Sequence, residues 1–360
     1  MSTKLKVLLG ALILLAAALL GFYFGYWVRT PKYALGQLQE AINRHDTAYV
    51  EEHIDTDRLF GKIFDETVTW EFSPRDGSGQ TRMNPALKEY MRSIRPVVIP
   101  VFTGQARNFI ITGRLDTDGP VDEDTSERGY HLAREMAYKI GMPNLTFSAL
   151  GGVESDGNVA IATLTVHDRQ LDADLPLKLR MERKDGQWVV TETTDFPSYL
   201  KARRKAILER LDKLNAPLRE KIARAVRIEE KGDKAPVFSI REIEGSPNLS
   251  ELEAVFTLSN IGDKEIISLS GTLSVADPSG IERFAESFEA NSIRPGQSVT
   301  VHNAWPLSPY IPDQSILAGR TGANLKGVFH IQYVIFSDGS SITLMDTLPE
   351  DEGTERRGDR

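Results

Sequence analysis

The feature that most constrains this chain is an uncharged stretch close to its N-terminus. From Val7 to Val28 there is no Asp, Glu, Lys or Arg. As an α-helix this run would be roughly 33 Å long, enough to cross a hydrocarbon core of about 30 Å. The apolar part of a secretory signal is shorter, about 7–15 residues. We therefore expect residues 1–29 to form an uncleaved transmembrane anchor, with an aromatic cluster at the membrane–water boundary.

The charges that flank this run are nearly balanced, because Lys4 and Lys6 precede it and Arg29 and Lys32 follow it. Long domains translocate largely regardless of such charges. We therefore expect the N-terminus inside and the body outside the membrane. The membrane is thus an expected partner of the chain.

Small residues recur on one face of the expected anchor, at Ala17, Gly21 and Gly25. Such a stripe lets two membrane helices approach closely, so it is a candidate helix-packing site for a homo-oligomer. The alternative is that Gly and Ala are simply common in membrane helices.

The composition excludes several kinds of chemistry. The chain has no cysteine, so disulfides, thiolate metal sites and cysteine nucleophiles are impossible. Its formal charge of -8 argues against a nucleic-acid partner. No phosphate loop, dinucleotide-binding fingerprint, nucleophile elbow or paired zinc histidines occur. We therefore expect no cofactor and no enzymatic activity.

The rest of the chain divides by its patterning into an α+β domain (30–197), a helical connector (198–234), a β-sandwich (235–348) and a disordered tail (349–360). The first domain opens with apolar residues at helical spacing and with Asp46 as a helix N-cap. A further helix is predicted from Pro85 to Ile94, ended by Pro96. Four strands follow, with hairpin turns at Asp156-Gly157 and Asp185-Gly186.

The connector is basic, with twelve Lys or Arg and six Asp or Glu between Lys201 and Lys234. It carries an apolar stripe at helical spacing, and Pro217 is expected to kink or split the helix. One interpretation is a helix that binds anionic lipid or an acidic partner. The other, which we favour, is a connector whose apolar stripe packs on the domains.

The last domain has about seven short alternating segments separated by turns, the rhythm of an immunoglobulin-like sandwich. Leu252, Ala254, Phe256 and Leu258 are predicted to form the buried face of one strand.

Two resemblances accompany these patterns. The run from Tyr33 to Ile42, followed by Asp46 and His53-Ile54-Asp55, resembles the opening of a bacterial envelope family known as domain of unknown function 2939. That resemblance implies a cystatin-like α+β sheet domain, a location at a bacterial inner membrane and no catalytic residues. The run Phe256–Gly262, with Ile293–Gln297, is similar to bacterial immunoglobulin-like domains and implies fold alone.

An acidic loop is the strongest metal-site candidate in the sequence. Asp116, Asp118, Asp122 and Asp124 crowd around Gly119, and oxygen ligands at such spacing suit the start of a calcium loop. The alternative is a hydrated acidic loop, because one ligand before the glycine is missing and a proline follows it.

Two adjacent pairs, His45-Asp46 and His167-Asp168, lack a nucleophile, and we interpret both as surface residues. By analogy with pockets in curled sheets, Asp168, Asp195 and Tyr199 are candidates to line a mouth.

These observations favour a membrane-anchored, non-enzymatic envelope protein that makes protein–protein contacts or assemblies. The alternative is a small-molecule or lipid-binding sheet domain, possibly enzymatic, tethered to the membrane. A third hypothesis gives the basic connector a lipid-surface role.

Overall fold

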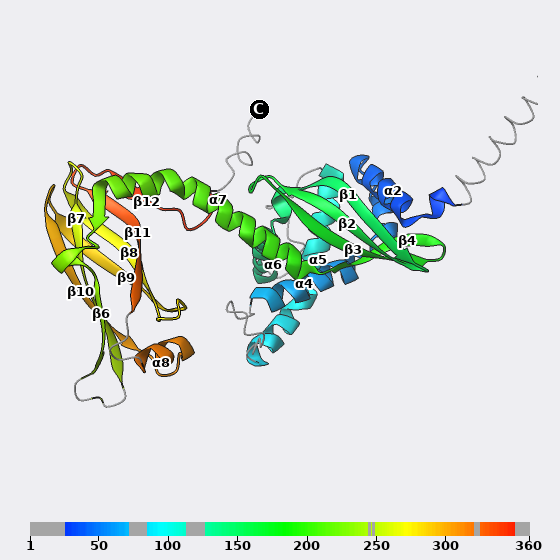
Figure 1. Cartoon of the computed structure of the whole chain (residues 1–360). Coiled ribbons are helices and arrows are strands. Elements are labelled where there is room, and N and C mark those ends of the chain that lie inside the picture. Colours follow the sequence, from blue (N-terminus) through cyan, green and yellow to red (C-terminus); the bar gives the residue numbers. More distant parts are fainter. Residues whose placement is uncertain are drawn as a thin grey trace, which may run out of the picture. The chain divides into compact units, whose positions relative to one another are not determined.

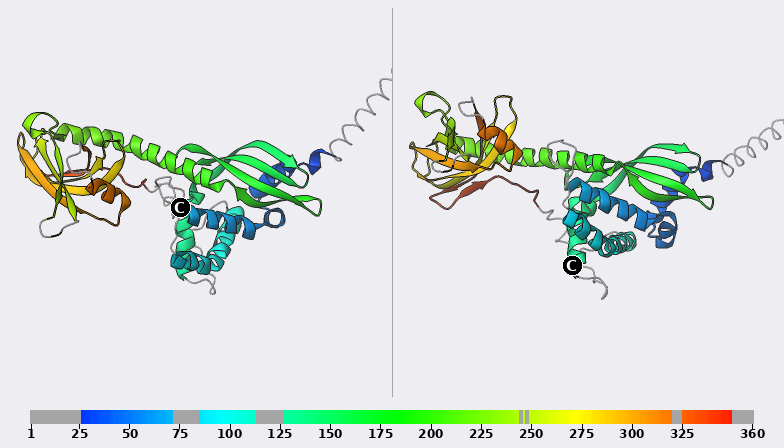
Figure 2. Two further views of the ribbon diagram at one scale, coloured as in Figure 1. Left: turned by 60° about the horizontal axis from the view of Figure 1, so that its bottom comes forward. Right: turned by 90° about the horizontal axis from the view of Figure 1, so that it is seen from below.

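The computed structural model describes residues 26–71, 85–112, 127–243, 246, 249–319 and 325–349. The chain forms two compact units, Met1–Leu208 and Glu209–Arg360. Figures 1 and 2 show helices and a sheet in the first unit and a predominantly β second unit. Each unit has a hydrophobic core of its own.

In the first unit, helices lead and an antiparallel sheet follows. The short turn and helices are η1 (Trp27–Arg29), α2 (Pro31–Asn43), α3 (Thr47–His53), α4 (Thr56–Glu71), α5 (Pro85–Thr112), α6 (Glu127–Lys139) and η2 (Met142–Asn144). The strands are β1 (Leu145–Asp156), β2 (Val159–Asp168), β3 (Ala173–Lys184) and β4 (Gln187–Thr194). They lie in the order β1-β2-β3-β4.

Local chemistry explains where the first helices begin. The Thr30 hydroxyl accepts a hydrogen bond from the Tyr33 N–H at 3.2 Å, at the start of α2. The Asp46 carboxylate accepts from the Tyr49 N–H at 3.1 Å, at the start of α3. These bonds satisfy N–H groups that have no partner within the helix. The predicted N-cap at Asp46 is therefore confirmed.

The sheet buries one face against α2 and α3. Side chains from the helices, such as Leu38 and Val50, form one cluster with Met181, Trp188 and Val190 of the sheet. A separate cluster lies among α4, α5 and α6. At the β3–β4 turn, Asp185 and Gly186 have φ values of 49° and 85°, the left-handed pair that a two-residue hairpin loop favours. The hairpin predicted there is confirmed.

Helix α5 corrects the prediction that Pro96 ends a helix, since it runs on to Thr112 through Pro96 and Pro100. Each proline removes one backbone donor and crowds the preceding turn. The residues between and after them, including Val98 and Phe102, are buried against α4 and α6. Burial of this apolar face offsets the local cost of the prolines.

Helix α7 (Phe196–Ala225) continues through Pro217 as one helix, so Pro217 does not split it, and a kink there stays a prediction. Its apolar stripe is packed at both ends. Leu200 belongs to a core cluster of the first unit, and Ile222 to the core of the second. The packed-connector interpretation is therefore confirmed at these two positions.

The second unit contains two antiparallel sheets. Its elements are β5 (Val226–Ile228), η3 (Gly232–Lys234), β6 (Val237–Glu242), β7 (Ser250–Asn260), β8 (Ile266–Ala276), β9 (Glu282–Ile293), β10 (Ser298–Leu307), α8 (Pro312–Ala318), β11 (Lys326–Phe336) and β12 (Ser341–Thr343). One sheet has the order β10-β7-β5, with β6 also paired to β7, and the other has the order β12-β11-β8-β9.

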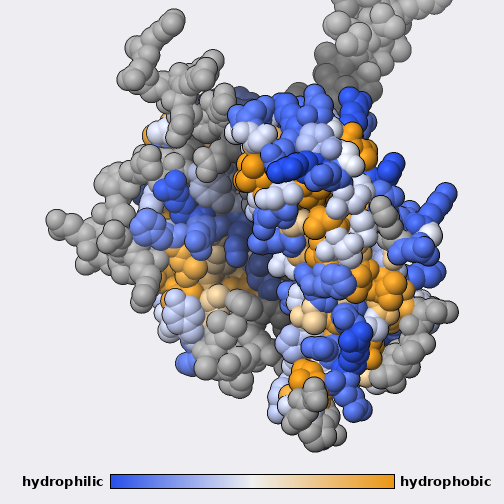
Figure 3. Space-filling view, turned by 90° about the vertical axis from the view of Figure 1, so that its left-hand side faces the viewer, coloured by the Kyte–Doolittle hydropathy of each residue, from blue (hydrophilic) through white to orange (hydrophobic). Residues whose placement is uncertain are grey.

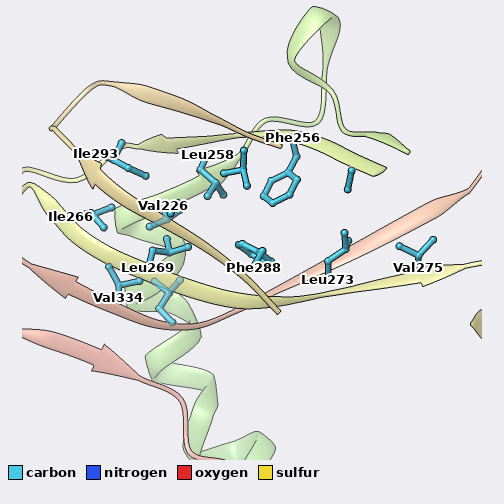
Figure 4. Close-up of a cluster of buried hydrophobic side chains, with 14 of the residues drawn as sticks. Val226, Phe256, Leu258, Ile266, Leu269, Leu273, Val275, Phe288, Ile293 and Val334 are labelled. Carbon is cyan, nitrogen blue, oxygen red and sulfur yellow. The ribbon is translucent and has the colours of Figure 1, made fainter. Parts of the chain in front are cut away.

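The core of this unit lies between the two sheets (Figure 4). The predicted inward face of β7 is confirmed, because Leu252, Ala254, Phe256 and Leu258 are all buried. The Phe256 and Phe288 rings meet edge to face with centroids 5.0 Å apart, a favourable aromatic arrangement. Alternation along the strands therefore identified this core correctly.

The fold class that we expected included a transmembrane helix, and that part of the prediction is wrong. None of the helices in the described residues combines the length and the hydropathy needed to cross a membrane. Most of the expected anchor, up to Gly25, lies outside the described residues, and its described end, Trp27–Arg29, is a short 3-10 turn. The structure supports an α+β chain with antiparallel sheets.

Candidate protein-contact surface on the second unit

The candidate site residues chosen from sequence fall mostly outside the described residues. Asp116, Asp118, Asp122 and Asp124 of the acidic loop lie there, and so do Ala17, Gly21 and Gly25 of the small-residue stripe. Within the described ranges, no three His, Asp or Glu side chains are grouped so that they could hold a metal ion. The calcium hypothesis therefore stays a prediction.

We interpreted Asp168 as a surface residue, and this is wrong, because its side chain is fully buried. One carboxylate oxygen accepts hydrogen bonds from the Gln170 and Leu171 N–H groups at 3.1 and 3.2 Å. The other accepts from the Arg203 Nε at 3.1 Å. The carboxylate thus joins the β2–β3 loop to α7.

Tyr199 lies in the same buried region. Its hydroxyl donates to the Ile140 carbonyl at 2.6 Å, and the Arg203 Nη1 donates to the Lys139 carbonyl at 2.7 Å. Burial raises the pKa of Tyr199 above its ordinary range. The structure therefore brings Tyr199 and Asp168 together around Arg203 as a packed polar network that fixes α7 to the end of α6.

Asp195 does not join this network. It is exposed, has a φ of 58°, and accepts a hydrogen bond from the Ser198 hydroxyl at 2.7 Å. It lies just before α7, where it helps to start the helix. The three residues proposed to line a mouth therefore serve as buried and capping groups.

The described surface contains a more informative feature, which sequence patterns did not reveal. Apolar side chains gather at one end of the sandwich: Tyr310 is 93% exposed, Ile281 50%, Ile311 46% and Ile316 42%. We call these four residues the α8 surface, because they lie on α8, on the loop before it and on the adjacent β8–β9 turn. In Figure 3, hydrophobic residues on the face that is shown form separate patches among hydrophilic ones.

The loop that carries Tyr310 is held in place by backbone and side-chain hydrogen bonds. The Tyr310 N–H donates to the Ser308 hydroxyl at 3.3 Å, and the Ser308 N–H donates to the Gln314 side chain at 2.8 Å. Pro309 and Pro312 restrict the backbone on either side. Leu317, on the inner side of α8, is fully buried and anchors the helix in the core.

A buried ionic group joins the two parts of this surface. Asp277 accepts from the Arg283 Nε at 3.2 Å, and Arg283 also pairs with Asp313 on α8. The Ser279 hydroxyl and nearby N–H groups hydrogen-bond to the Asp277 carboxylate, and they lower its pKa to about 2. The β8–β9 turn and the start of α8 are therefore linked through Arg283.

The strand beside this surface is acidic. Glu282 and Glu286 of β9 are exposed, and within the described ranges no ion pair joins either of them to a Lys or Arg. An apolar surface with unpaired carboxylates beside it suits a partner that presents apolar and basic side chains.

The sequence contained one signal for this site that we did not use. Ser308-Pro309-Tyr310-Ile311-Pro312 places two large apolar side chains between prolines, outside any alternating segment. A strand or helix would bury such residues, whereas a proline-bounded loop leaves them exposed.

Comparisons with known proteins bear on a small part of the chain. Residues 20–69 match a family model described as protein of unknown function (DUF2939). The predicted resemblance to that family is thus supported for this segment. No curated protein matches the chain.

The solved structures that match this chain include one with a low TM-score. It is described as the X-ray structure of Northeast Structural Genomics Consortium target SoR45, with 12% identity and a TM-score of 0.20 over 32% of this chain and 78% of that chain. A likeness at this level carries no argument about fold or activity. The cystatin-like and immunoglobulin-like labels therefore stay predictions.

Proposed function

We propose that this chain acts through protein–protein contact, and that the α8 surface of its second unit is a contact site. The observation that carries the proposal is Tyr310, whose ring is almost wholly exposed on a loop fixed by hydrogen bonds. Exposed aromatic side chains on rigid supports dominate the binding energy of many interfaces, because little conformational entropy is lost on binding.

The neighbouring side chains support the same function. Ile281, Ile311 and Ile316 would surround the tyrosine in a bound complex and exclude water from it. The carboxylates of Glu282 and Glu286 would favour a partner with Lys or Arg at the rim of the contact.

The alternative of a ligand-binding sheet domain has less support. The side of the first unit's sheet that faces α2 and α3 is filled by Met181, Trp188 and Val190, all of them buried in one cluster with the helices. Packing of this kind favours a structural core over a ligand cavity. The expected location at a bacterial inner membrane stays a prediction.

Site-specific photo-crosslinking tests the proposal. The crosslinking amino acid p-benzoylphenylalanine is placed at Tyr310 in one variant and at Ile267 in another, and cells that express the full chain are irradiated. Ile267 is the matched control, because it is also an exposed apolar residue of the second unit but lies on β8. We expect a discrete crosslinked protein from position 310 and none from position 267.

A second variant tests whether the surface acts as a unit. Ile316→Lys in the photo-crosslinking variant should reduce the yield of the adduct about tenfold or more, because a charge is placed in an apolar contact. Circular dichroism would establish that the variant is folded. Equal adducts from positions 310 and 267, or an adduct that Ile316→Lys leaves unchanged, would show that the α8 surface is not a contact site.

A further inference from the structure

The sheet of the first unit has one open edge, which is formed by β1 (Figure 1). Within the described residues, β1 is paired only with β2. The opposite edge, β4, is bridged at one residue, because Ile54 forms a bridge with Val190 and the Asp55 N–H donates to the Val190 carbonyl at 2.8 Å. An open edge presents backbone N–H and C=O groups that can pair with another strand.

Three edge strands of the second unit, β9, β10 and β12, carry features that oppose such pairing. On β9, Glu286 lies in register with the fully buried Leu273 and is itself exposed, so this edge carries a charge on its core-facing side that still reaches water. On β10, Pro306 lacks a backbone donor, and β12 is only three residues long. Inward charges, edge prolines and short strands all discourage the addition of another strand.

Strand β1 differs from these edges in its composition. From Leu145 to Val153 it has no charged residue and no proline, and its first charge is Glu154. Most of its residues are exposed, and the Phe147 ring is among the exposed large hydrophobic groups. Irregularities between Phe147 and Ala149, and between Leu150 and Val153, interrupt the ladder with β2. Such bulges twist an edge and limit the length over which another strand can pair.

The irregularity between Leu150 and Val153 contains two glycines, Gly151 and Gly152, which have different surroundings. A Cβ on Gly151 would lie 2.9 Å from the Thr163 carbonyl, so the approach of β2 explains that glycine. A Cβ on Gly152 would meet nothing within 4 Å. Glycine within a strand often marks a place where another backbone approaches closely. Steric contact within 4 Å of a Cβ therefore does not explain Gly152.

We propose that β1 pairs with β1 of a second copy of this chain in an antiparallel arrangement centred on Ala149. In that register Leu145 of one copy lies opposite Val153 of the other, so the uncharged segment pairs with itself. The Glu154 and Asp156 carboxylates of the two copies then lie at opposite ends of the contact. A parallel arrangement would instead place like charges beside each other, which is unfavourable.

Engineered cysteines test both the contact and its register, because the full chain has no cysteine of its own. In the dimer, two Ala149→Cys residues would face each other with Cα atoms about 4.5–5.5 Å apart, within the range for a disulfide. Two Asp156→Cys residues would be roughly 45 Å apart. After mild oxidation we expect a covalent dimer from Ala149→Cys and none from Asp156→Cys.

Light scattering on the full chain supplies an independent measurement. The protein should be dimeric, and Ala149→Lys should weaken dimerisation about tenfold or more, because two like charges would then lie opposite each other. Val328→Lys is the matched control, since Val328 is exposed on β11 in the second unit. It should leave the dimer unchanged.

Three results would overturn the proposal. They are a monomeric wild-type chain, an oligomer in which Ala149→Cys forms no disulfide, and equal crosslinking by Ala149→Cys and Asp156→Cys. None of them depends on the α8 surface, so the proposal fails separately from the proposed function. An oligomer formed through another segment is recognised by the second result.

Discussion

Removal of the Asp168 carboxylate should unfold the first unit more readily than almost any other single substitution there. In Asp168→Ala the Arg203 guanidinium keeps its hydrogen bond to the Lys139 carbonyl but loses its counter-charge. Both Asp168 and Arg203 are at least nine-tenths buried, so water cannot readily replace the carboxylate. The Gln170 and Leu171 N–H groups lose their acceptor as well.

The expected magnitude follows from this geometry. Removing one partner of a buried ion pair costs about 3–5 kcal/mol, because the other charge stays buried without compensation. For a unit of roughly 200 residues this corresponds to a fall in melting temperature of about 6–20 °C. Space around the arginine is tight, since a Cβ on Gly141 would lie 2.2 Å from the Arg203 Nε. The guanidinium therefore has little room to move towards solvent.

Urea unfolding of the full chain measures this change. A Trp305→Phe background removes a fluorophore of the second unit, so that the buried Trp188 reports on the first. Arg204→Ala is the matched control, because Arg204 is the next residue of α7 and is exposed. It should change the free energy of unfolding by less than about 0.5 kcal/mol.

A double-substitution cycle separates the ion pair from general packing. Arg203→Met alone should also be destabilising, whereas Asp168→Leu with Arg203→Met should cost less than the sum of the two single changes. If Asp168→Ala costs less than about 1 kcal/mol, or no more than Arg204→Ala, the reasoning from buried charge is refuted.

Local patterns were sufficient to predict much of the fold. Asp46 was recognised as an N-cap from its place before an apolar periodic segment, and the structure shows the expected bond to Tyr49. Asp185-Gly186 predicted a hairpin, because a two-residue hairpin turn needs a positive φ at both residues and few residue types other than Asp, Asn and Gly tolerate it. Phe256 and its alternate neighbours on β7 were predicted to be buried and are. In each case the sequence signal that predicts the feature lies within a few residues.

The predictions that were wrong concern features that depend on contacts between residues far apart in the sequence. Pro96 was expected to end a helix and Pro217 to kink or split one, because the cost of proline is local and visible in the sequence, yet both helices continue. The gain that offsets it at Pro96 comes from burial against α4 and α6, which lie far away along the chain. Asp168 was taken for a surface residue because its partner, Arg203, is 35 residues distant. Such contacts require the tertiary structure.

The candidate sites show the same division between local and long-range information. The acidic residues from Asp116 to Asp124 attract attention as a cluster, although a cluster alone does not make a site. Tyr310 carries no chemical motif, and its exposure depends on how α8 and the β8–β9 turn are joined through Arg283. The open edge at β1 likewise follows from the strand order, which no local pattern specifies.

Two further predictions concern the second unit. The folded pKa of Asp277, about 2, lies below the unfolded value of about 3.9, so its contribution to stability is present above pH ~4 and is lost as the pH falls through about 2. Asp277→Asn should therefore make the acid unfolding of this unit, followed by hydrogen exchange of its amide groups, less steep between about pH 4 and pH 2, and an unchanged profile would show that the Asp277 carboxylate does not stabilise the unit in this way. Asn215→Ala should destabilise the unit by about 1–3 kcal/mol, because the Asn215 side chain exchanges two 2.8 Å hydrogen bonds with the Met345 backbone. Faster hydrogen exchange at the Met345 amide is the expected signature, and if that amide stays as protected as before, the side chain of Asn215 does not hold this segment on α7.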